Sequence, residues 1–494
     1  MLLLILVLPT VAGLAAFLVR GDRVRRGLLV GTAFGHLALV AGAWVRLPAP
    51  AWGGWLDLDA VGLLFLSVTS LLFAVASTYA VGYLEREGHH AHRDFEEGRV
   101  FSDAPEARFV GCLLFFLASM SLVTITQHLG LLWVAVEATA LASAPLISFH
   151  RHHRSLEATW KYLLICSVGI ALALLGTFFV GVAAARPGGE SASMLLSDLM
   201  AEAAVLQPGW LRAGFILLLV GYGTKMGLAP LHTWLPDAHA EAPSVASALL
   251  SGALLNCAFV GILRGQQLLG AAGLAPFGRG LLVVLGLVSM TFGAVFVIRQ
   301  ADFKRLLAYS SVEHMGIMAL GVGLGGAATF GALLHAVNHS VAKGMLFLVA
   351  GNLLAAYRTK STAIVRGATR ALPVSGVLWL VGLFAITGSP PFGTFFSEFS
   401  ILKGALDAGR WWVAAAYLGL LGAVFAGMGR IMVRMAQGEP GEGVAVEPHE
   451  AWSAVMAPAV LLALALLLGL WVPRGLAELL GAAGQLVGGG PWRV

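Results

Sequence analysis

Titratable side chains stand inside apolar runs of this sequence, where a charged group is unfavourable. Lys225 follows the apolar run Phe215–Val220, and Pro230 comes shortly after it. A lysine in mid-membrane costs about 2.5–3.5 kcal/mol on insertion scales, and a proline removes a backbone donor and disturbs the helix. A helix broken at membrane depth is tolerated only inside protein or beside a water-filled cavity. The charge and the break together suggest part of an ion path.

Glu137 is the natural partner for Lys225. It lies in the middle of the apolar segment Leu131–Ala140, which contains no cation. A buried carboxyl group alone stays protonated, whereas one beside an ammonium group ionises, so the two residues could exchange a proton. The alternative is a structural glutamate that is bonded to neighbouring backbone.

His335, His339 and Lys343 follow one another at intervals of four residues. At 100° per residue they lie within about 80° of each other and form one polar stripe on a helix. An HxxxH pair can bind zinc, but no acidic third ligand lies nearby in this span. Imidazole passes protons in both directions near neutral pH, so we predict a proton relay and no metal site. The alternative is two histidines that are satisfied by packing.

Glu398 follows a second interrupted span, in which the segment Thr387–Gly393 contains two prolines and two glycines. Two interrupted spans in corresponding positions are typical of internally repeated transporters. Glu137, Lys225, the histidine stripe and Glu398 then form the predicted path. Glu313 and His314 are further polar residues of the tenth predicted span. Secondary candidates are Lys161, His232, Asp237, Lys304, Ser251 and Asn256.

When the arginines near span ends are counted with the loops, the four basic residues that remain inside predicted spans are all lysines. They are Lys161, Lys225, Lys343 and Lys403. Lysine can lose its proton when it is desolvated, whereas arginine stays charged, so this set suits proton exchange. The alternative is that lysines near helix ends extend to the interface, which fits Lys161 and Lys403 best.

The elements that position these residues are membrane helices. The 494-residue chain is 58% hydrophobic, has a mean hydropathy of +0.85, and only 12% of its residues are charged. A soluble protein carries about 25% charged residues, so we predict an all-α polytopic membrane protein with about fourteen transmembrane helices. The net charge of +5 then reflects membrane topology, not nucleic-acid binding. The predicted spans are 2–19, 27–46, 58–83, 108–125, 128–149, 158–184, 211–235, 243–264, 279–298, 305–324, 328–356, 372–406 (broken), 411–434 and 452–472.

Four regions and one orientation follow from these spans. Residues 1–106 hold the first three spans, 107–264 a first antiporter-like repeat of five, 265–435 a second such repeat, and 436–494 a loop and the last span. Both termini fall on the same side of the membrane in this arrangement, and most loop arginines and lysines fall on the opposite side. Basic loops stay in the cytoplasm, so both termini are predicted on the non-cytoplasmic side of the inner membrane.

Redox and metal motifs are weak in this sequence. Cys112, Cys166 and Cys257 lie in separate apolar runs without CxxC spacing, and no Rossmann glycine fingerprint follows a strand. We therefore expect no cofactor in this chain, with the redox cofactors in partner subunits. The histidine-rich segments Glu85–Arg108 and His150–Arg154 suggest either a metal site or, as we favour, a solvated cytoplasmic loop.

Five motifs resemble the antiporter-like membrane subunits of respiratory complex I and Mrp-type antiporters. The resemblance covers roughly residues 60–435, and its wording is most similar to component F of hydrogenase-4 and formate hydrogenlyase. The motifs are Leu132–Glu137 (LWVAVE), Lys225–His239 (KMGLAPLHTWLPDAH), Asp302–Ser311 (DFKRLLAYSS), the spacing of His335, His339 and Lys343, and Gly388–Gly393 (GSPPFG).

The resemblance implies a fold of two inverted five-helix repeats, each with a broken helix. It implies that Glu137 and Lys225 form a coupling pair, that Lys343 and its histidines form the central link, and that Glu398 ends the second repeat. Many relatives carry a lysine or histidine in the eighth span, where this chain has Ser251 and Asn256. The step from Lys225 to Lys343 would then depend on water or on the span-eleven histidines.

The predicted function is proton translocation within a redox-driven complex of the hydrogenase-4 or NADH–quinone oxidoreductase type. The expected partners are other membrane subunits of the same family and peripheral redox subunits, among them a [NiFe] hydrogenase module. Whether the chain itself counts as an enzyme stays open. The alternatives are a subunit of a Na⁺(K⁺)/H⁺ antiporter, part of an ion-coupled complex for inorganic-carbon uptake, and a scaffold whose channel is inactive.

Overall fold

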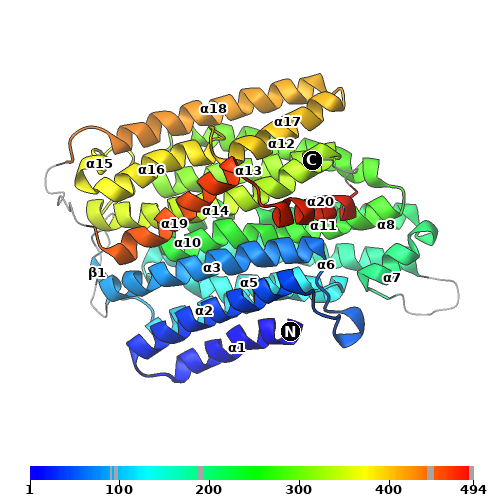
Figure 1. Cartoon of the computed structure of the whole chain (residues 1–494), viewed down its shortest axis with the longest axis horizontal. Helices are drawn as coiled ribbons and strands as arrows, with labels where there is room; N and C mark the ends of the chain where they lie inside the picture. The colour runs from blue at the N-terminus through cyan, green and yellow to red at the C-terminus, as the bar shows by residue number, and fades with distance from the viewer. Residues whose placement is uncertain (89–91, 94–97, 99, 186–192, 442–449, 489–494) are drawn as a thin grey trace.

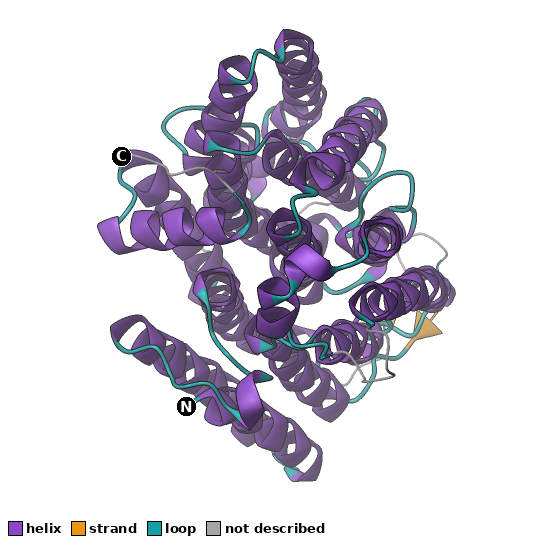
Figure 2. Cartoon of the chain, turned by 90° about the vertical axis from the view of Figure 1, so that its right-hand side faces the viewer, coloured by secondary structure: helices purple, strands orange, loops and turns teal. Residues whose placement is uncertain are grey.

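The chain folds into a bundle of roughly parallel helices (Figure 1). A computed structural model describes residues 1–88, 92–93, 98, 100–185, 193–441 and 450–488. In Figure 1, α18 lies along one edge of the bundle and α1 along the opposite edge, and Figure 2 shows many of the helices closer to end-on.

The first half of the described chain contains short elements between long helices. In chain order they are α1 (Leu2–Leu18), α2 (Asp22–Val45), η1 (Trp52–Gly54), α3 (Ala60–Glu87), β1 (His92–Arg93), β2 (Val100–Phe101), α4 (Glu106–Ile125), α5 (Leu129–Ile147), α6 (His153–Ala184), α7 (Leu196–Ala201), η2 (Ala203–Val205), α8 (Pro208–Met226), α9 (Trp234–Glu241), α10 (Ser244–Leu249) and η3 (Leu250–Leu254). Strands β1 and β2 pair antiparallel and form a two-residue ribbon.

The second half continues from α11 to α20. Its helices are α11 (Leu255–Ala271), α12 (Ala275–Val297), α13 (Phe303–Leu324), α14 (Ala327–Tyr357), α15 (Ala368–Ala371), α16 (Pro373–Ile386), α17 (Gly393–Asp407), α18 (Trp411–Ala436), α19 (Trp452–Leu470) and α20 (Arg474–Leu486).

Ten helical segments of the described chain are long and apolar enough to cross a membrane. The mostly helical, membrane-spanning fold is therefore confirmed. The other predicted spans lie in shorter or more polar helices. Among these are α1 and α16, which are apolar but short. The polar α13 contains Lys304, Arg305, Glu313 and His314.

Two predicted spans are broken, and the breaks lie where the prolines predicted them. The first span divides into α8 and α9, and α8 ends at Gly227, whose φ of +83° is a left-handed conformation that glycine adopts readily. The second span divides into α16 and α17, with Gly388 at a φ of +63° between them. Lys225 thus lies in the last turn of α8, immediately before its break.

A third irregularity interrupts the eighth span, for which the sequence predicted a continuous helix. Between α10 and α11 the segment η3 is a π-helical turn, and all of its residues are buried. Such turns arise when one extra residue enters a helix, and they are frequent at functional sites. A hydrophobicity pattern cannot reveal this turn, because the residues on both sides remain apolar.

Close helix contacts bring α8 against α6 and α12 against α13. A Cβ atom added at Gly176 of α6 would lie 2.8 Å from the carbonyl oxygen of Gly214 of α8, and one at Gly286 of α12 would lie equally close to that of Gly316 of α13. Small residues allow such close approach between membrane helices. The contact between α6 and α8 places Lys225 beside Tyr162 of α6.

Helix α20 was not predicted from the sequence. It follows α19 after a short turn and packs against α3 and α14. It alternates apolar residues such as Leu480 and Ala483, which are buried, with exposed ones such as Arg474. An amphipathic helix of 13 residues is too short and too polar to be recognised as a membrane span from hydropathy.

Candidate functional site

The ammonium group of Lys225 is fully buried in the bundle. Its Nζ atom donates a hydrogen bond to the hydroxyl oxygen of Tyr162 of α6 over 2.7 Å, and it lies 4.6 Å from the centre of the Tyr162 ring. The Tyr162 hydroxyl also lies 2.7 Å from the Oγ atom of Ser143 of α5. A chain of hydrogen bonds therefore joins α8, α6 and α5 at this point.

Glu137 is half-buried on α5 and does not form the expected direct pair with Lys225. Its Oε1 atom accepts a hydrogen bond from the exposed Ser167 of α6 over 3.1 Å, and Oε2 has no partner among the described residues. The Tyr162 hydroxyl takes the place at Lys225 that was expected for the carboxylate. Glu137 remains close enough to Lys225 to interact with it electrostatically.

Ser251 and Asn256 connect the eighth span to the second half of the chain. The Oγ atom of Ser251, in the π-helical turn, lies 2.8 Å from the Oγ atom of Ser311 of α13. The side-chain amide of Asn256 donates to the Oγ atom of Ser340 of α14 over 2.8 Å. Both residues are buried and turned inward, so the span that lacks a charged residue still contributes polar contacts.

Lys343 lies against the same part of α13. Its Nζ atom donates to the carbonyl oxygen of Leu307 over 2.6 Å and to the Oγ atom of Ser310. Ser310 and Ser311 are neighbours on α13. The hydroxyl group of Ser310 contacts Lys343, and that of Ser311 contacts Ser251 in the π-helical turn. Lys343 is fully buried.

His239 lies where α9 meets α14, and the sequence provides no reason to include it in the predicted path. It lies on α9, is fully buried, and stacks on Phe347 of α14 with ring centres 4.7 Å apart. Neither ring nitrogen has a hydrogen-bond partner among the described residues. Its ring is close enough to Lys343 and His339 to interact with both electrostatically.

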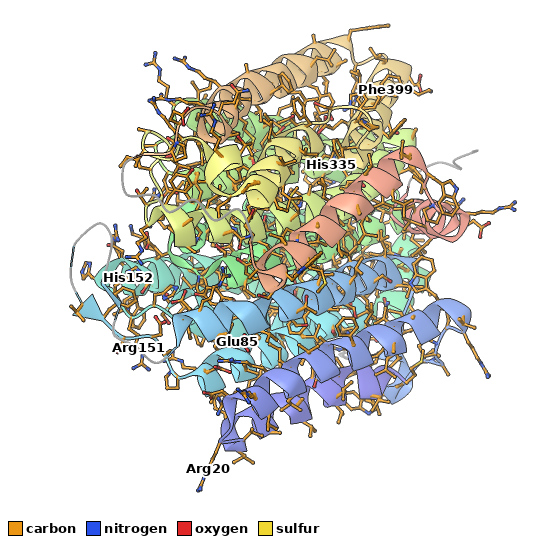
Figure 3. The ribbon with its side chains drawn as sticks, turned by 60° about the vertical axis from the view of Figure 1, so that its left-hand side comes forward. Arg20, Glu85, Arg151, His152, His335 and Phe399 are labelled. Carbon is orange, nitrogen blue, oxygen red and sulfur yellow. The ribbon has the colours of Figure 1, made fainter. Side chains whose placement is uncertain are left out.

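His335 ends the stripe in a cluster of polar groups within the bundle (Figure 3). Its Nε2 atom lies 2.8 Å from Nδ1 of His314, and its Nδ1 atom lies 2.9 Å from the Oγ atom of Ser397. The ring of His339 lies 5.2 Å from that of His314. The three residues of the stripe therefore share one face of α14, which lies against α13.

Glu313 and Glu398 add two buried carboxyl groups to this cluster. Glu313 Oε2 lies 3.6 Å from Nε2 of His314, and both Glu313 oxygens lack hydrogen-bond partners among the described residues. A carboxylate oxygen of Glu398 lies within 4.8 Å of ring nitrogens of His314 and His335. The buried cluster therefore draws on α13, α14 and α17.

The secondary candidates form ion pairs, a hydrogen bond to the backbone, or aromatic contacts. Asp237 bridges Lys161, at 3.1 Å, and Arg305, at 2.5 Å. Lys304 is buried and donates to the carbonyl oxygen of Ala242 over 2.5 Å, close to the end of α9. His232 packs against the rings of Phe292, Phe296 and Tyr309.

The histidine-rich segments lie apart from the buried cluster. His89, His90 and the side chain of His92 lie outside the described residues. His150 Nδ1 lies 2.7 Å from Asp103 Oδ1, and Arg151 and His152 lie at the end of the bundle that Figure 3 shows at the left.

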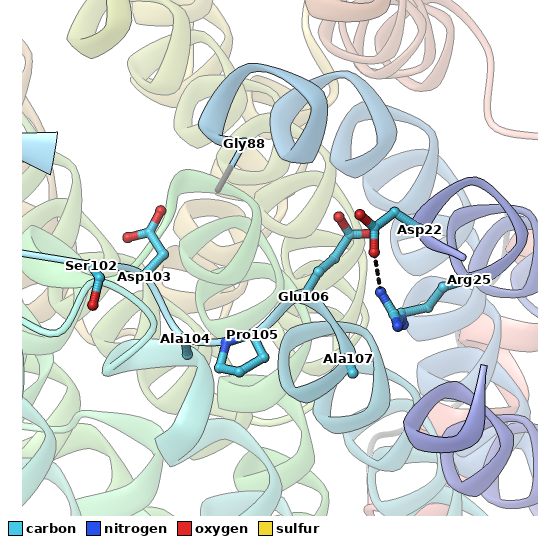
Figure 4. A pocket seen from close by; sticks show the side chains of 9 residues that line it. All are labelled: Asp22, Arg25, Gly88, Ser102, Asp103, Ala104, Pro105, Glu106 and Ala107. Carbon is cyan, nitrogen blue, oxygen red and sulfur yellow. Dashed lines mark hydrogen bonds and ion pairs between the residues drawn. The ribbon is translucent and has the colours of Figure 1, made fainter. Parts of the chain in front are cut away.

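A polar pocket of about 330 Å³ opens beside these segments (Figure 4). Asp22 and Arg25, which line it, form an ion pair over 2.5 Å, and Glu106 pairs with Arg26 over 2.8 Å. These charges are engaged with one another.

The structure adds Tyr162, Ser310, Glu313, His314 and His239 to the predicted site. A signal for some of them was present, because Ser310, Ser311, Glu313 and His314 are polar residues within an apolar span. The sequence does not single out Tyr162. A tyrosine beside Lys161 is equally typical of a helix end at the membrane interface.

Comparison with known sequences found one matching family and several similar proteins. Residues 126–426 match a family described as "NADH:quinone oxidoreductase/Mrp antiporter, TM". A hydrogenase-4 component F homolog of Methylacidiphilum infernorum (isolate V4) is 36% identical over 83% of this chain and 85% of that protein. Hydrogenase-4 component B of Escherichia coli (strain K12) is 32% identical over 75% of this chain but only 53% of that longer protein. The chain thus spans about half the length of component B.

Solved structures share the fold. A chain of respiratory complex I from Thermus thermophilus with bound NADH superposes with a TM-score of 0.81, at 26% identity, over 99% of this chain and 100% of that chain. A chain of the membrane-bound sulfane sulfur reductase, an archaeal respiratory membrane complex, superposes with a TM-score of 0.85, at 20% identity, over 99% and 98% of the two chains. The latter likeness concerns the fold alone.

Proposed function

Because the chain belongs to the NADH:quinone oxidoreductase/Mrp antiporter transmembrane family, we propose that it is a proton-translocating membrane subunit of a redox-driven complex. The observation that carries this proposal is a series of buried polar side chains that extends across both halves of the bundle. Buried lysines and carboxyl groups inside a membrane are unfavourable and commonly mark ion or proton pathways, so their number here favours an ion path.

The first part of the path connects Glu137 to Lys225. Glu137 is half-buried on α5, and Lys225 is fully buried. Tyr162 and Ser143 supply hydroxyl groups between α8 and α5 at hydrogen-bond distance. A hydroxyl group both donates and accepts, so it passes a proton without holding a charge.

The second part connects Lys225 to Lys343, across the span that lacks a charged residue. We propose that the paired hydroxyl groups of Ser251 and Ser311 lead to Ser310, which contacts Lys343. His239 stacks on Phe347 of α14, the helix that carries Lys343, and offers a titratable group on the same route. The eighth span can therefore pass protons although it carries Ser251 and Asn256 where many relatives carry a lysine or histidine.

The last part leads from Lys343 through His339 and His335 to Glu398. His314 stacks against His335 with ring centres 5.0 Å apart and their nitrogens in contact, and the ring of His339 lies 5.2 Å from that of His314, so three imidazole groups are gathered on this route. Imidazole takes a proton at one nitrogen and gives one from the other, so it suits this position.

Electrons pass through partner subunits in this proposal. The three cysteines are buried on three different helices, α4, α6 and α11, without the spacing of an iron–sulfur motif. We propose that the partners are membrane subunits of the same family together with peripheral redox subunits, one of them a [NiFe] hydrogenase module. The observation in favour is the likeness to component F of hydrogenase-4.

The proposed topology has fourteen membrane crossings, ten of them in two inverted repeats of five. In it α8 with α9, α10 with η3 and α11, and α16 with α17 each make one crossing, as do α1, α2 and α13. The proposed repeats are residues 107–264 and 265–435, after three initial crossings in 1–106, and 436–494 holds the last. The basic loops favour termini outside the cytoplasm and insertion in the inner membrane.

A Na⁺(K⁺)/H⁺ antiporter subunit is the second candidate function. The family description, which names Mrp antiporters beside NADH:quinone oxidoreductases, is the observation that favours it. In this candidate, transport depends on sodium or potassium and needs no redox substrate.

The experiment that tests the proposal uses the whole complex, purified in mild detergent and placed in vesicles. Lys225→Ala and Glu137→Ala should abolish proton uptake that is driven by the redox substrate, while the complex still assembles. The matched control is Lys403→Ala, because Lys403 lies on α17 but pairs with Asp407 at the surface. Normal proton uptake in either path variant contradicts the proposal, and uptake that requires sodium without a redox substrate favours the antiporter.

A further inference from the structure

Three metal-ligand atoms from three helices meet in the buried cluster. A ring nitrogen of His314 (α13), a ring nitrogen of His335 (α14) and a carboxylate oxygen of Glu398 (α17) all lie within 4.8 Å of one another. No pattern within one helix contains this set. The third, acidic ligand that the HxxxH motif lacks in its own span comes from α17, and His314 replaces His339 as the second histidine.

The Glu398 carboxylate is buried without a hydrogen-bond partner for one of its oxygens. The residue is 7% exposed, and Oε1 has no partner among the described residues. The missing side chain of Gly388 leaves room for the other oxygen, because a Cβ atom added to that glycine would lie 1.8 Å from Glu398 Oε2. A buried carboxylate with free lone pairs is an unsatisfied acceptor, and a cation would satisfy it.

The outer nitrogen of His335 has a hydrogen-bond partner that suits a metal site, and the outer nitrogen of His314 faces a carboxylate at ion-pair distance. His335 Nδ1 lies 2.9 Å from the Oγ atom of Ser397, and His314 Nε2 lies 3.6 Å from Oε2 of Glu313. The nitrogens that remain, His314 Nδ1 and His335 Nε2, face each other at 2.8 Å. Metal-binding histidines commonly give their second nitrogen to a carboxylate or another oxygen, which fixes the ring orientation.

Charge and donor type select the class of ion. Two imidazole nitrogens and one carboxylate oxygen are the ligands of zinc-like divalent metals, whereas magnesium and calcium prefer sites made of oxygen alone. A divalent ion together with Glu398 and Glu313 would make the cluster neutral. Three protein ligands leave a fourth position for water, as in open zinc sites.

We propose that His314, His335 and Glu398 form a binding site for a divalent transition metal of the zinc class. The metal replaces the proton that is shared between the two imidazole nitrogens, which must move apart from 2.8 Å to about 3.3 Å to accept two metal–nitrogen bonds. Because Glu398 and His335 also end the proposed proton path, a bound metal blocks that path. This consequence for transport rests on the proposed function, whereas the metal site itself does not.

Binding of Co²⁺ to the purified full-length chain tests the site without any measurement of transport. Tetrahedral Co²⁺ absorbs visible light, and metal analysis after desalting gives the amount that is retained. Wild type should retain one Co²⁺ per chain, displaceable by Zn²⁺, and His335→Gln and Glu398→Gln should each bind at least about tenfold more weakly. His36→Gln is the control, because His36 is equally buried but lies between Ser70 and Ser121 in another part of the bundle.

Two further variants keep the three ligands and cover the case in which a ligand variant does not fold. Ser397→Ala and Glu313→Gln change only the outer partners and should weaken Co²⁺ binding about 10- to 100-fold. The proposal is overturned by a Co²⁺ affinity that is unchanged in all four site variants, or by equal loss in His36→Gln. Co²⁺ binding that is normal while Zn²⁺ leaves proton uptake intact would support the metal site and count against the proton path through Glu398.

Discussion

The ammonium group of Lys225 contacts Tyr162 in two ways, through a 2.7 Å hydrogen bond to the hydroxyl oxygen and through the ring, whose centre lies 4.6 Å away. The ring stabilises a cation by its quadrupole, and the hydroxyl group leads on to Ser143. Tyr162 therefore both stabilises the charge and connects it to α5. This double contact takes the place of the direct pairing with Glu137 that the sequence suggested.

Removal of the Tyr162 hydroxyl separates these two contributions. Tyr162→Phe keeps the ring beside Lys225 but interrupts the hydrogen-bond chain to Ser143. A hydrogen bond to a charged group is worth about 1.5–3 kcal/mol, so redox-driven proton uptake should fall about 10- to 100-fold. Fluorescence quenching of a pH-sensitive dye in vesicles that contain the whole complex measures this rate.

Tyr222→Phe is the matched control for this variant. Tyr222 is a buried tyrosine of α8, the helix that carries Lys225. Its variant should transport protons at the wild-type rate. Equal rates in the two phenylalanine variants would show that the Tyr162 hydroxyl group has no part in transport.

The two histidines of the PLHTWLPDAH motif should differ in their importance. His239 stacks on Phe347 of α14, the helix that carries Lys343, whereas His232 packs among Phe292, Phe296 and Tyr309. His239→Phe should lower proton uptake by at least roughly tenfold, as expected when a proton-transfer group is lost. His232→Phe should leave at least about half of the rate, because a ring of similar shape fills an aromatic cluster. The same vesicle assay compares them, and a larger loss in His232→Phe than in His239→Phe would contradict this assignment.

The hydroxyl group of Ser310 should matter more than that of an exposed serine. Ser310 accepts a hydrogen bond from Lys343 at the point where the π-helical turn meets α13. Ser310→Ala leaves the ammonium group with the Leu307 carbonyl oxygen alone and should slow proton uptake about tenfold or more. Ser400→Ala provides the comparison, because the exposed Ser400 bonds only to its own helix. Wild-type uptake in Ser310→Ala would remove the proposed link through the eighth span.

A buried ion pair outside the path should control stability and its dependence on pH. Arg264 of α11 is 1% exposed and forms two hydrogen bonds with the carboxylate of Asp59, which precedes α3. Burial opposes the ionisation of Asp59, but the charge and hydrogen bonds of Arg264 outweigh it and hold the pKa of Asp59 below its usual value. Removal of one partner of a buried pair costs about 3–5 kcal/mol, so Asp59→Asn should lower the thermal unfolding midpoint.

The direction of the pH effect follows from the lowered pKa of Asp59. Its contribution to stability is fully present above the pKa of the unfolded chain, about 3.9, and is lost as the pH falls through the lower pKa of the folded chain. The wild-type unfolding midpoint in detergent should therefore fall toward that of Asp59→Asn as the solution is acidified. A constant difference between the two proteins over this pH range would show that the pair is not the source of the stability.

Periodicity and composition predicted most of the helices, because a membrane span must be long, apolar and internally hydrogen-bonded. Pro230 and the pair Pro390–Pro391 likewise predicted both helix breaks, because proline cannot donate within a helix. The π-helical turn at Ser251 and the amphipathic α20 escaped prediction. Neither changes the hydropathy of its surroundings enough to be recognised.

The site was predictable within single helices but not between them. The stripe of His335, His339 and Lys343 follows from helix geometry alone. Which residues they meet depends on how α13 and α17 pack against α14, and the sequence carries no signal for that. The meeting of His335 with His314, and of Lys343 with Ser310, therefore became visible only in the folded structure.

The most direct test of proton conduction is the ratio of protons moved to electrons transferred in the complex that contains Lys343→Met. Methionine has a similar length and no charge, so the fold is expected to persist while the central titratable group is lost. Electron transfer by the complex should continue, and the ratio should fall at least about tenfold, as in the other variants of the path. An unchanged ratio with Lys343→Met, in vesicles shown to be tight to protons, would contradict the proposed path.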